Sequence, residues 1–561
     1  MTSIDILVLL LPVGPLLSAG ATALLSPIVG RRVVRLATTL GAATLILAVF
    51  LLWDEISRPE NSPAVHATSW GSLLLDPLGL LMAVLIALIS LLVRVYSVRY
   101  MVEEAGYVRF FVLLDLMVAT LLTMVTAGDL ITLIVAWHLV GLLLYLLLGH
   151  DLQSRSAHRY GFRTFITYRF GDLPLVLAAI LLYRTYDTWS LPEIFRLIQA
   201  NPNLQTSAGL PVTEVVSGLV ALAAFARSAQ FLLHTWLPYT MDGPTPVSAL
   251  MHAGVVNAGG FLINRFAPVF VHTESVLHWV FLVGLVTALA GSVLMLSQSD
   301  TKKTLGYSTM GQMGFMTMEC GVGAFSLAIF HLIAHGLFKG TMFLNSGSVI
   351  GQARRHDAVP KDDMYTFVIE KQPQARRSPF VVMVVTTTLV PLIVLGLAHL
   401  VIASEVFQEQ GAIILLFFGW VTGAQLLFAA YRMPTRSTWR LVGIIGLAFT
   451  VVVIGYTAVT HAFAQFLYPD GGVAALYAAA HIDPATAGVL AVLVVVVALV
   501  GWASAHYASR RVDVEERVLT RLQRSFYASL SRELYVADVY AALNRGLLAA
   551  SSKVNTWMRW G

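Results

Sequence analysis

Residues 130–150 read LITLIVAWHLVGLLLYLLLGH, an apolar run of roughly 20 residues that is long enough to cross a lipid bilayer as one helix. One titratable side chain, His138, stands in the middle of this run. Similar runs recur along the chain, in which 57% of the 561 residues are hydrophobic and 12% are charged. This apolar content exceeds that of an ordinary soluble domain and predicts an all-α polytopic membrane protein.

The apolar runs predict fifteen membrane spans. They lie near residues 4–28, 33–53, 76–98, 108–127, 129–148, 162–183, 213–237, 245–266, 275–297, 304–322, 324–349, 379–403, 411–431, 439–463 and 485–508. Arg and Lys concentrate in alternate loops, such as 155–163 and 354–377, whereas 404–410 and 464–484 contain neither. Because positive charge accumulates in short cytoplasmic loops, we expect the N-terminus outside and the C-terminus in the cytoplasm.

Other features limit the possible partners. No basic residue precedes the first apolar run, so we expect residues 1–30 to be a retained span rather than a cleaved signal. The single cysteine, Cys320, excludes an intramolecular disulfide and gives no metal motif. The inner loops account for the formal charge of +5, and no nucleic-acid partner is expected. Residues 509–561 alternate basic and apolar residues, which is typical of an amphipathic helix on a membrane or a partner.

Ionisable residues within the spans are the first candidates for function, since each costs several kcal/mol unless it is paired or hydrated. They cluster between the fifth and eleventh spans: His138, Arg169, Asp172, Arg227 and His252, together with a column in the eleventh span.

That column consists of His331, His335 and Lys339, at positions i, i+4 and i+8 of AIFHLIAHGLFKGTMF. On a helix the three side chains share one stripe over about 12 Å, and such a stripe can pass protons. They could instead be packing histidines bonded to neighbouring carbonyls. Two histidines at i, i+4 are also half of a zinc site, although HExxH and a third ligand nearby in the sequence are missing.

The stretch HTWLPYTMDGPTPVSALMHA, residues 234–253, is the most specific string in the chain. Pro238, Gly243, Pro244 and Pro246 are expected to interrupt two helices beside Arg227 and His252. Broken helices expose backbone dipoles to ions in transporters. The alternative is a proline-rich inner turn with no such role.

Three segments together resemble one known family: FARSAQFLLHTWLPYTMDGPTPVSALMHAGVVNAGGFLI, SDTKKTLGYSTMGQMGFM and AIFHLIAHGLFKGTMFLNSGSVI. They are similar to the proton-conducting antiporter-like membrane subunits of respiratory complex I, related hydrogenases and multisubunit sodium/proton antiporters. The resemblance runs from about residue 75 to 350. It implies two inverted five-helix repeats, spans 4–8 and 9–13, in which helices 7 and 12 are interrupted.

The resemblance implies five regions. These are 1–106 with helices 1–3, 107–270 as the first repeat, 271–435 as the second repeat, 436–508 with helices 14 and 15, and 509–561 as a cytoplasmic tail.

The resemblance also assigns roles. Arg169 and Asp172 match the family's RxGD, and His252, His331, His335 and Lys339 match its central polar axis. His138 and Arg227 replace a family glutamate and lysine, and the family's span 12 lysine has no counterpart, since only His399 is titratable there. An arginine effectively cannot lose its proton, so we interpret Arg227 as a fixed charge whose counter-ion is found elsewhere, with Asp172 as the candidate.

The missing span 12 lysine and the short tail favour the membrane subunits of DAB-type inorganic-carbon accumulation complexes within this family. The resemblance then implies a subunit of the bacterial inner membrane that conducts protons or Na+ and has no catalytic motif or cofactor of its own. Its partner would be a large soluble zinc protein resembling carbonic anhydrases, on the cytoplasmic face, which hydrates CO2 to bicarbonate. The alternatives are a subunit of a cation/proton antiporter or redox-driven pump, and a non-conducting scaffold.

The first prediction concerns His138. Two cations about 6 Å apart at an effective dielectric near 20 repel by about 3 kcal/mol, so beside Arg227 the imidazole is expected to be a neutral relay or gate. His138→Ala and His138→Gln are therefore expected to slow ion transport by reconstituted protein. Wild-type transport rates in both variants would contradict this role.

Overall fold

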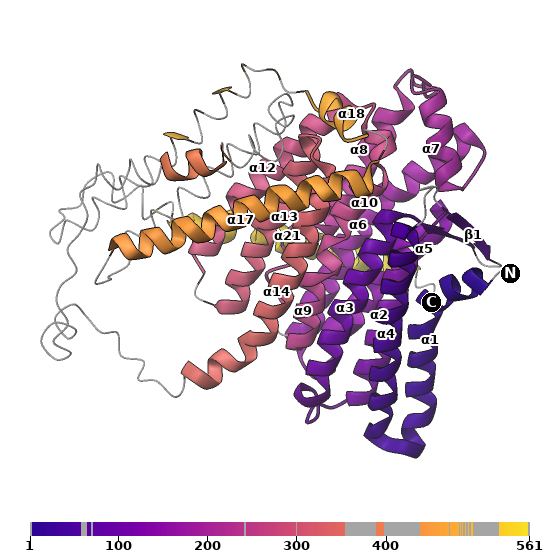
Figure 1. The fold of residues 1–561 in the computed structure, drawn as a ribbon. Coiled ribbons are helices and arrows are strands. Elements are labelled where there is room, and N and C mark those ends of the chain that lie inside the picture. The colour runs from indigo at the N-terminus through magenta and orange to yellow at the C-terminus, as the bar shows by residue number, and fades with distance from the viewer. Residues whose placement is uncertain are drawn as a thin grey trace, which may run out of the picture.

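The computed structural model describes residues 3–57, 64–68, 71–240, 243–298, 300–353, 389–395, 438–469, 472–481 and 527–558, with isolated positions between 397 and 525. Within these residues the chain is a bundle of long apolar helices (Figure 1). Among the described residues, eight helical segments are long and apolar enough to cross a membrane. The predicted spans 12, 13 and 15, with His399 and residues 354–388, lie mostly or wholly outside the described residues.

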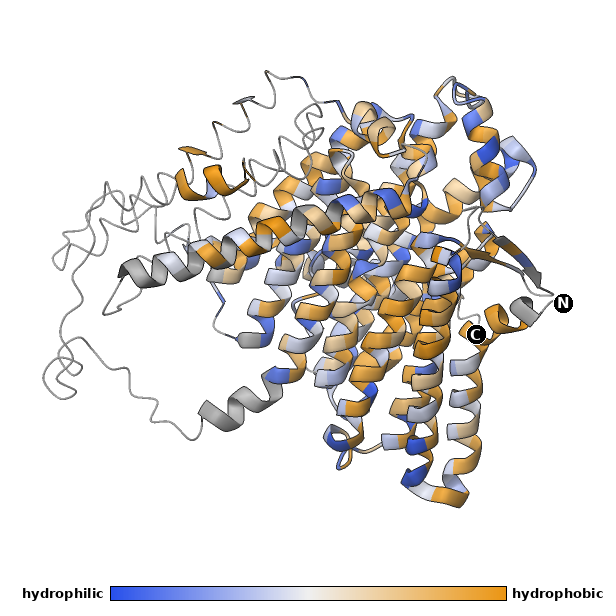
Figure 2. Ribbon diagram, viewed as in Figure 1, coloured by the Kyte–Doolittle hydropathy of each residue, from blue (hydrophilic) through white to orange (hydrophobic). Residues whose placement is uncertain are grey.

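The first half of the bundle contains the helices of the predicted spans 1–6. They are α1 Ser3–Val29, α2 Val33–Ser57, α3 Pro77–Tyr100, α4 Tyr107–Val125, α5 Leu130–Leu148 and α6 Arg155–Tyr186, with a 3-10 turn η1 Gly30–Arg32 between α1 and α2. Figure 2 shows hydrophobic residues along the middle of these helices and hydrophilic residues gathered near their ends, as expected for spans.

The second half of the described bundle contains the remaining helices, both short and long. They are α7 Leu191–Ala200, α8 Val212–Arg227, α9 Thr245–Ala253, η3 Val255–Asn257, α10 Ala258–Arg265, α11 Ala267–Phe270, α12 Glu274–Leu296, α13 Thr301–Gly321, α14 Phe325–Ala353, α17 Thr438–Leu467, α18 Gly472–Ala479, η6 Glu533–Tyr535 and α21 Val536–Met558. The loop 185–212 contains the short helix α7, and part of the predicted amphipathic tail is helical as α21. The helix α17 crosses α13 and α14 obliquely in Figure 1.

One element differs from the all-α prediction. Strands β1 Ala64–Thr68 and β2 Gly71–Leu75 form a small antiparallel hairpin in the loop between α2 and α3. Gly71 has a φ of 155°, near extended backbone, and its position leaves no room for a Cβ beside Thr132. A hairpin this short gives no periodic signal that stands out from loop sequence.

Capping side chains set where several of the helices begin. Asp76, Asp129 and Asp300 accept hydrogen bonds from Gly79, Thr132 and Lys303 backbone N–H groups at 3.0, 2.8 and 2.8 Å. Such caps satisfy N–H groups that the first helical turn leaves without partners. Asp76 also pairs with Arg265 of α10 at 2.6 Å, so one carboxylate starts α3 and ties it to the second half of the bundle.

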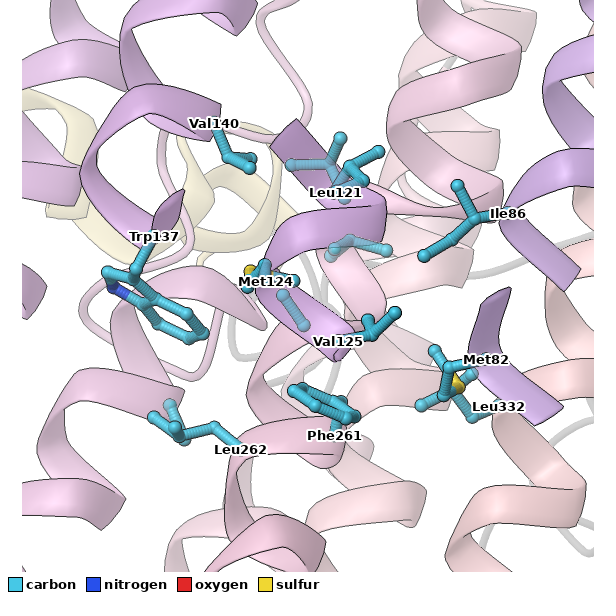
Figure 3. Close-up of a cluster of buried hydrophobic side chains, with 14 of the residues drawn as sticks. Met82, Ile86, Leu121, Met124, Val125, Trp137, Val140, Phe261, Leu262 and Leu332 are labelled. Atoms are coloured by element: carbon cyan, nitrogen blue, oxygen red, sulfur yellow. The ribbon is translucent and has the colours of Figure 1, made fainter. Parts of the chain in front are cut away.

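A cluster of apolar side chains holds the bundle together around α3, α4, α5, α10 and α14. Figure 3 shows Trp137 and Val140 of α5 in this cluster with Met124 of α4 and Phe261 of α10. These four side chains are almost fully buried, with exposed fractions of 0 to 2%. Because neighbouring residues on a helix point about 100° apart, Trp137 facing inward turns His138 toward another face of α5.

The packing of α12 against α13 depends on glycines. Gly284 and Gly314 lie where a Cβ would collide with backbone atoms of the opposite helix. Small residues of this kind let two membrane helices approach closely, with van der Waals contact as the main attraction. The contact fixes α13, which carries several polar residues described below.

A buried ion pair joins α3 and α4. Arg94 and Asp115 contact each other directly at exposed fractions of 2% and 0%, and Ser18 of α1 donates to the Asp115 carboxylate at 2.7 Å. The sequence analysis did not single out this pair, because Arg94 lies near the end of a predicted span, where a long side chain often reaches water.

Arg94→Met leaves the Asp115 charge buried without its cation and is expected to lower the free energy of unfolding by about 3–5 kcal/mol. The double variant Arg94→Met, Asp115→Leu should recover most of this loss. Thermal unfolding in detergent, followed by tryptophan fluorescence, measures both effects. The exposed Arg99→Met on the same helix is the control, and equal stability of Arg94→Met and Arg99→Met would rule out a stabilising role for the pair.

Candidate functional site

The carboxylate of Asp172 in α6 is the centre of one group of predicted site residues. Arg169 lies 2.9 Å from it, the His138 Nδ1 atom 3.0 Å and the Arg227 Nη2 atom 3.4 Å. Three elements, α5, α6 and the end of α8, therefore bring His138, Arg169 and Arg227 to a single negative charge. We call these four residues the Asp172 cluster.

Arg227 is fully buried, and aromatic rings enclose its guanidinium. The guanidinium carbon lies 4.0 Å from the Tyr168 ring centre and 4.6 Å from that of Trp137. Arg227 also donates to the Trp137 carbonyl. A planar, permanently charged group suits this stacked position better than a lysine would. The ion pair with Asp172 is the counter-ion contact expected for Arg227.

His138 lies at the edge of the cluster. Its side chain is 50% exposed, and both of its ring nitrogens contact the Arg169 guanidinium. The expectation of a neutral ring considered only repulsion from Arg227. In the structure the Asp172 carboxylate and the Arg169 guanidinium both contact the ring. The charges acting on His138 therefore include those of Asp172 and Arg169 as well as that of Arg227.

The column in α14 faces polar residues of α13. The Lys339 ammonium donates to the Ser308 hydroxyl at 2.8 Å. The His331 Nδ1 atom lies 3.1 Å from both Glu319 oxygens, and its Nε2 atom lies 3.0 Å from the Gln312 side-chain oxygen. These partners are side chains. The alternative interpretation, in which the histidines only pack between helices, predicted backbone carbonyls as their partners.

His335 lies between these two contacts on α14. Its ring centre is 6.3 Å from that of His331, and its side chain is buried. Neither ring nitrogen has a hydrogen-bond partner within the part of the chain that the structure describes. The three titratable residues thus lie in sequence along one buried helix face, as the spacing predicted.

His252 approaches the same helices from α9. Its Nδ1 atom lies 3.1 Å from the Thr309 hydroxyl, and its ring stacks on Phe343 at 4.1 Å. The contact joins α9, which follows the helix break, to α13 and α14. We call His252, His331, His335 and Lys339 with their α13 partners the central file.

The helix break lies earlier than the prolines indicated. The helix α8 ends at Arg227, and Ala229 and Leu232 adopt left-handed φ values of 49° and 73°. Residues 228–240 are non-helical, and Pro244 and Pro246 begin α9, where proline is well tolerated because first-turn N–H groups lack helical partners anyway. The predicted interruption is therefore present, but the prolines start the second helix and do not end the first.

Polar side chains compensate for the interrupted backbone. Ser228 donates to the Val256 carbonyl at 2.8 Å, and Trp236 donates to the Ala226 carbonyl at 3.1 Å. The buried Gln230 amide donates to the Met313 carbonyl of α13 at 3.2 Å. Gln230 is three residues from Arg227, so the break brings a polar side chain near the Asp172 cluster into contact with α13, the helix that supplies the partners of the central file.

Several polar residues of this site were not identified from the sequence. They are Gln230, Ser308, Thr309, Gln312 and Glu319. Glu319 gave a usable signal, because an acid in a predicted span is costly without a partner. The others are neutral and common in membrane helices, so only the structure separates them from packing residues. No group of three or more His, Cys, Asp or Glu residues forms a metal site among the described residues.

Comparisons with known proteins identify the family. The family described as NADH:quinone oxidoreductase/Mrp antiporter, transmembrane, matches residues 127–426, and the complex I chain 5 N-terminus family matches residues 68–111. A relative from Halothiobacillus neapolitanus, called probable inorganic carbon transporter subunit DabB1, is 54% identical over 98% of this chain and 99% of its own. Chain 5 of the NAD(P)H-quinone oxidoreductase of Synechocystis sp. is 34% identical over 70% of this chain, which spans 59% of that protein.

Solved structures share the fold. The Mrp complex from Dietzia sp. DQ12-45-1b matches with a TM-score of 0.60 and 24% identity, covering 98% of this chain and 60% of that one. An archaeal membrane-bound sulfane sulfur reductase matches with a TM-score of 0.58 and 18% identity, covering 84% of this chain and 99% of that one.

Asp172→Asn removes the negative charge that three cationic or titratable groups share. Ion transport by this variant is expected to fall by roughly tenfold or more, because Arg227 then keeps a buried charge without its carboxylate. Flux into proteoliposomes measures the effect. Asp187→Asn, at the exposed end of the same helix, makes the same chemical change where a left-handed φ of 51° accommodates asparagine. Equal flux in the two variants would contradict a role for Asp172 in transport.

Proposed function

Because this chain belongs to the NADH:quinone oxidoreductase/Mrp antiporter family and is a cation-translocating, multi-pass membrane subunit, we propose that it energises inorganic-carbon accumulation. The observation that carries the proposal is the identity of 54% with an inorganic carbon transporter subunit over nearly the whole length of both chains. The quinone oxidoreductase subunits match over less of their own length.

The proposed ion route uses the central file and the Asp172 cluster. His252, His331, His335 and Lys339 are the groups that gain and lose protons, and Arg227 is a fixed charge balanced by Asp172. The burial of Lys339 and His335 supports this assignment, since ionisable groups inside a bilayer are costly and mark ion or proton pathways. The helix break at residues 228–240 supplies polar backbone and Gln230 between the two groups.

Gln312 is suited to a histidine that changes its protonation state. In the observed arrangement both His331 nitrogens face oxygen atoms, which matches an imidazolium that donates twice. If the Gln312 amide turns over, its NH2 group donates to a neutral ring nitrogen instead. One residue therefore provides a hydrogen bond to His331 before and after proton loss.

The proposed partner is a large soluble zinc protein similar to carbonic anhydrases, on the cytoplasmic face of the inner membrane. Moving one charge across 100 mV releases about 2.3 kcal/mol, which corresponds to about a fiftyfold bias in an equilibrium. This energy suffices to drive hydration of CO2 to bicarbonate in one direction. The chain itself would hold no cofactor in this scheme.

The proposed topology follows the basic loops: fifteen spans in all, two inverted five-helix repeats, the N-terminus outside and the C-terminus in the cytoplasm. The order of the described helices α1–α14 and the break after α8 support this arrangement. The alternation of basic loops supports the orientation.

A second candidate is a subunit of a cation/proton antiporter or a redox-driven pump. The identity of 34% with a quinone oxidoreductase chain and the fold shared with the Mrp complex favour it. In that case the Asp172 cluster and the central file would conduct the ion as before, and only the partner would differ.

Purification of the tagged chain from its native membrane, followed by metal analysis, separates the two candidates. We expect a soluble zinc-containing subunit to co-purify in about equal amounts, and bicarbonate accumulation by cells to stop when an uncoupler removes the proton gradient. Small membrane subunits or iron–sulfur proteins in place of the zinc protein would favour the second candidate and contradict the first.

A further inference from the structure

The C-terminal segment returns to the bundle and places a buried carboxylate at one end of it. Glu533 of η6 is 2% exposed. Its Oε1 atom lies 2.5 Å from the Lys303 ammonium, and the Tyr239 hydroxyl donates to its Oε2 atom at 2.7 Å. Lys303 begins α13, and Tyr239 lies between α8 and α9, so three distant parts of the chain meet here. We call Tyr239, Lys303 and Glu533, with Arg163 of α6, the mouth cluster.

Arg163 connects the mouth cluster to the rest of the C-terminal segment. Its guanidinium carbon lies 5.2 Å from the ring centres of both Tyr239 and Tyr540, so the cation lies between two aromatic rings. Tyr540 also donates to the Leu232 carbonyl at 2.7 Å. The segment thus contacts the helix break itself, because Leu232 is one of the left-handed residues there.

The backbone of this segment is strained where it docks. Glu533, Leu534 and Tyr535 have φ values of 57°, 55° and 61°, a left-handed conformation that is unfavourable for a non-glycine residue. Three such residues in a row persist only where surrounding contacts hold them. At Glu533 these contacts are the ion pair with Lys303 and the hydrogen bond from Tyr239.

The mouth cluster continues into the central file along α13. Tyr307 lies one turn beyond Lys303 and interacts electrostatically with the Glu533 carboxylate. Its neighbour Ser308 accepts from Lys339, the first member of the central file at this end. From Lys303 to Ser308 the helix rises about 7.5 Å. The Glu533 carboxylate lies beside Lys303 and the Lys339 amine beside Ser308, so about one and a half turns of α13 separate their contact points.

We propose that Glu533 is the carboxylate through which the ion route exchanges protons with the cytoplasm. This inference rests on the proposed function. Glu533 takes a proton by way of Lys303, whose side chain is 18% exposed, and becomes a carboxylic acid. It returns to the carboxylate when that proton passes by Tyr307 and Ser308 to the neutral amine of Lys339. The first transfer leaves Lys303 to regain a proton from water. The second turns the Lys339 amine into an ammonium, which passes its proton on along the central file before the next transfer.

Several charged or titratable groups face Glu533 and shape its behaviour. Besides Lys303 and Tyr239 they are Arg163 of α6, His234 of the helix break and Tyr307 of α13. Burial and the Glu533 carboxylate raise the pKa of the Tyr239 hydroxyl, so Tyr239 stays a donor at physiological pH.

The test compares proton flux in Glu533→Gln, Glu533→Asp and wild-type protein, purified with any partner and reconstituted in liposomes. Glu533→Gln keeps the size and the oxygen that Tyr239 donates to, but it cannot carry a proton. Its flux is expected to fall roughly tenfold or more and to lose its dependence on pH at the cytoplasmic side. Glu533→Asp should retain at least about a third of the wild-type flux, because it keeps the carboxylate.

Glu193→Gln is the matched control, because Glu193 is an exposed carboxylate paired with Arg196 on α7. It should conduct as the wild type does. Wild-type flux in Glu533→Gln, or equal losses in Glu533→Gln and Glu533→Asp, would overturn the proposal, the second because it points to packing alone. If the wild-type protein itself conducts no protons, the proposed function fails and this inference fails with it.

Discussion

The cost of burying charge in a bilayer is the constraint on which this structure depends. The Asp172 carboxylate offsets this cost for the buried Arg227, and it also contacts Arg169 and the half-exposed His138. One carboxylate therefore joins α6 to α5 and α8, because Arg227 cannot withdraw without leaving a buried charge unpaired. The same solution recurs at Asp115, Asp76 and Glu533, each of which joins elements far apart in the sequence.

Much of the fold could be predicted because its signals are periodic. Apolar runs of about 20 residues located α1–α6 and α12–α14, and the spacing of His331, His335 and Lys339 placed them on one face of one helix. The partners of these residues could not be predicted, since contacts such as Glu319 with His331 depend on how two helices pack. The same holds for Arg94 and Asp115, which lie 21 residues apart on separate helices.

The sequence motif of residues 234–253 indicated the right region for the helix break, but its prolines are not the residues that end α8. The prolines of residues 234–253 drew attention to the right region, yet α8 ends at Arg227, where Ser228, Gln230 and Trp236 supply hydrogen bonds to the interrupted backbone. Side chains that satisfy a broken helix leave weak traces in sequence, because each is ordinary by itself. Proline is conspicuous, and here it marks the start of α9.

The alignment of α13 with α14 explains why Lys339 and His331 of the central file each lie beside polar side chains of α13. The two helices run in opposite directions, so the residue numbers of two partners add up to nearly the same value. Ser308 contacts Lys339, and both Gln312 and Glu319 contact His331. Ser308, Gln312 and Glu319 share one face of α13, since multiples of 100° per residue bring them within about 40° of one another. The glycine contacts with α12 fix the opposite side of the helix. One rigid helix therefore holds hydroxyl, amide and carboxylate groups at set depths beside Lys339 and His331, the two ends of the column on α14.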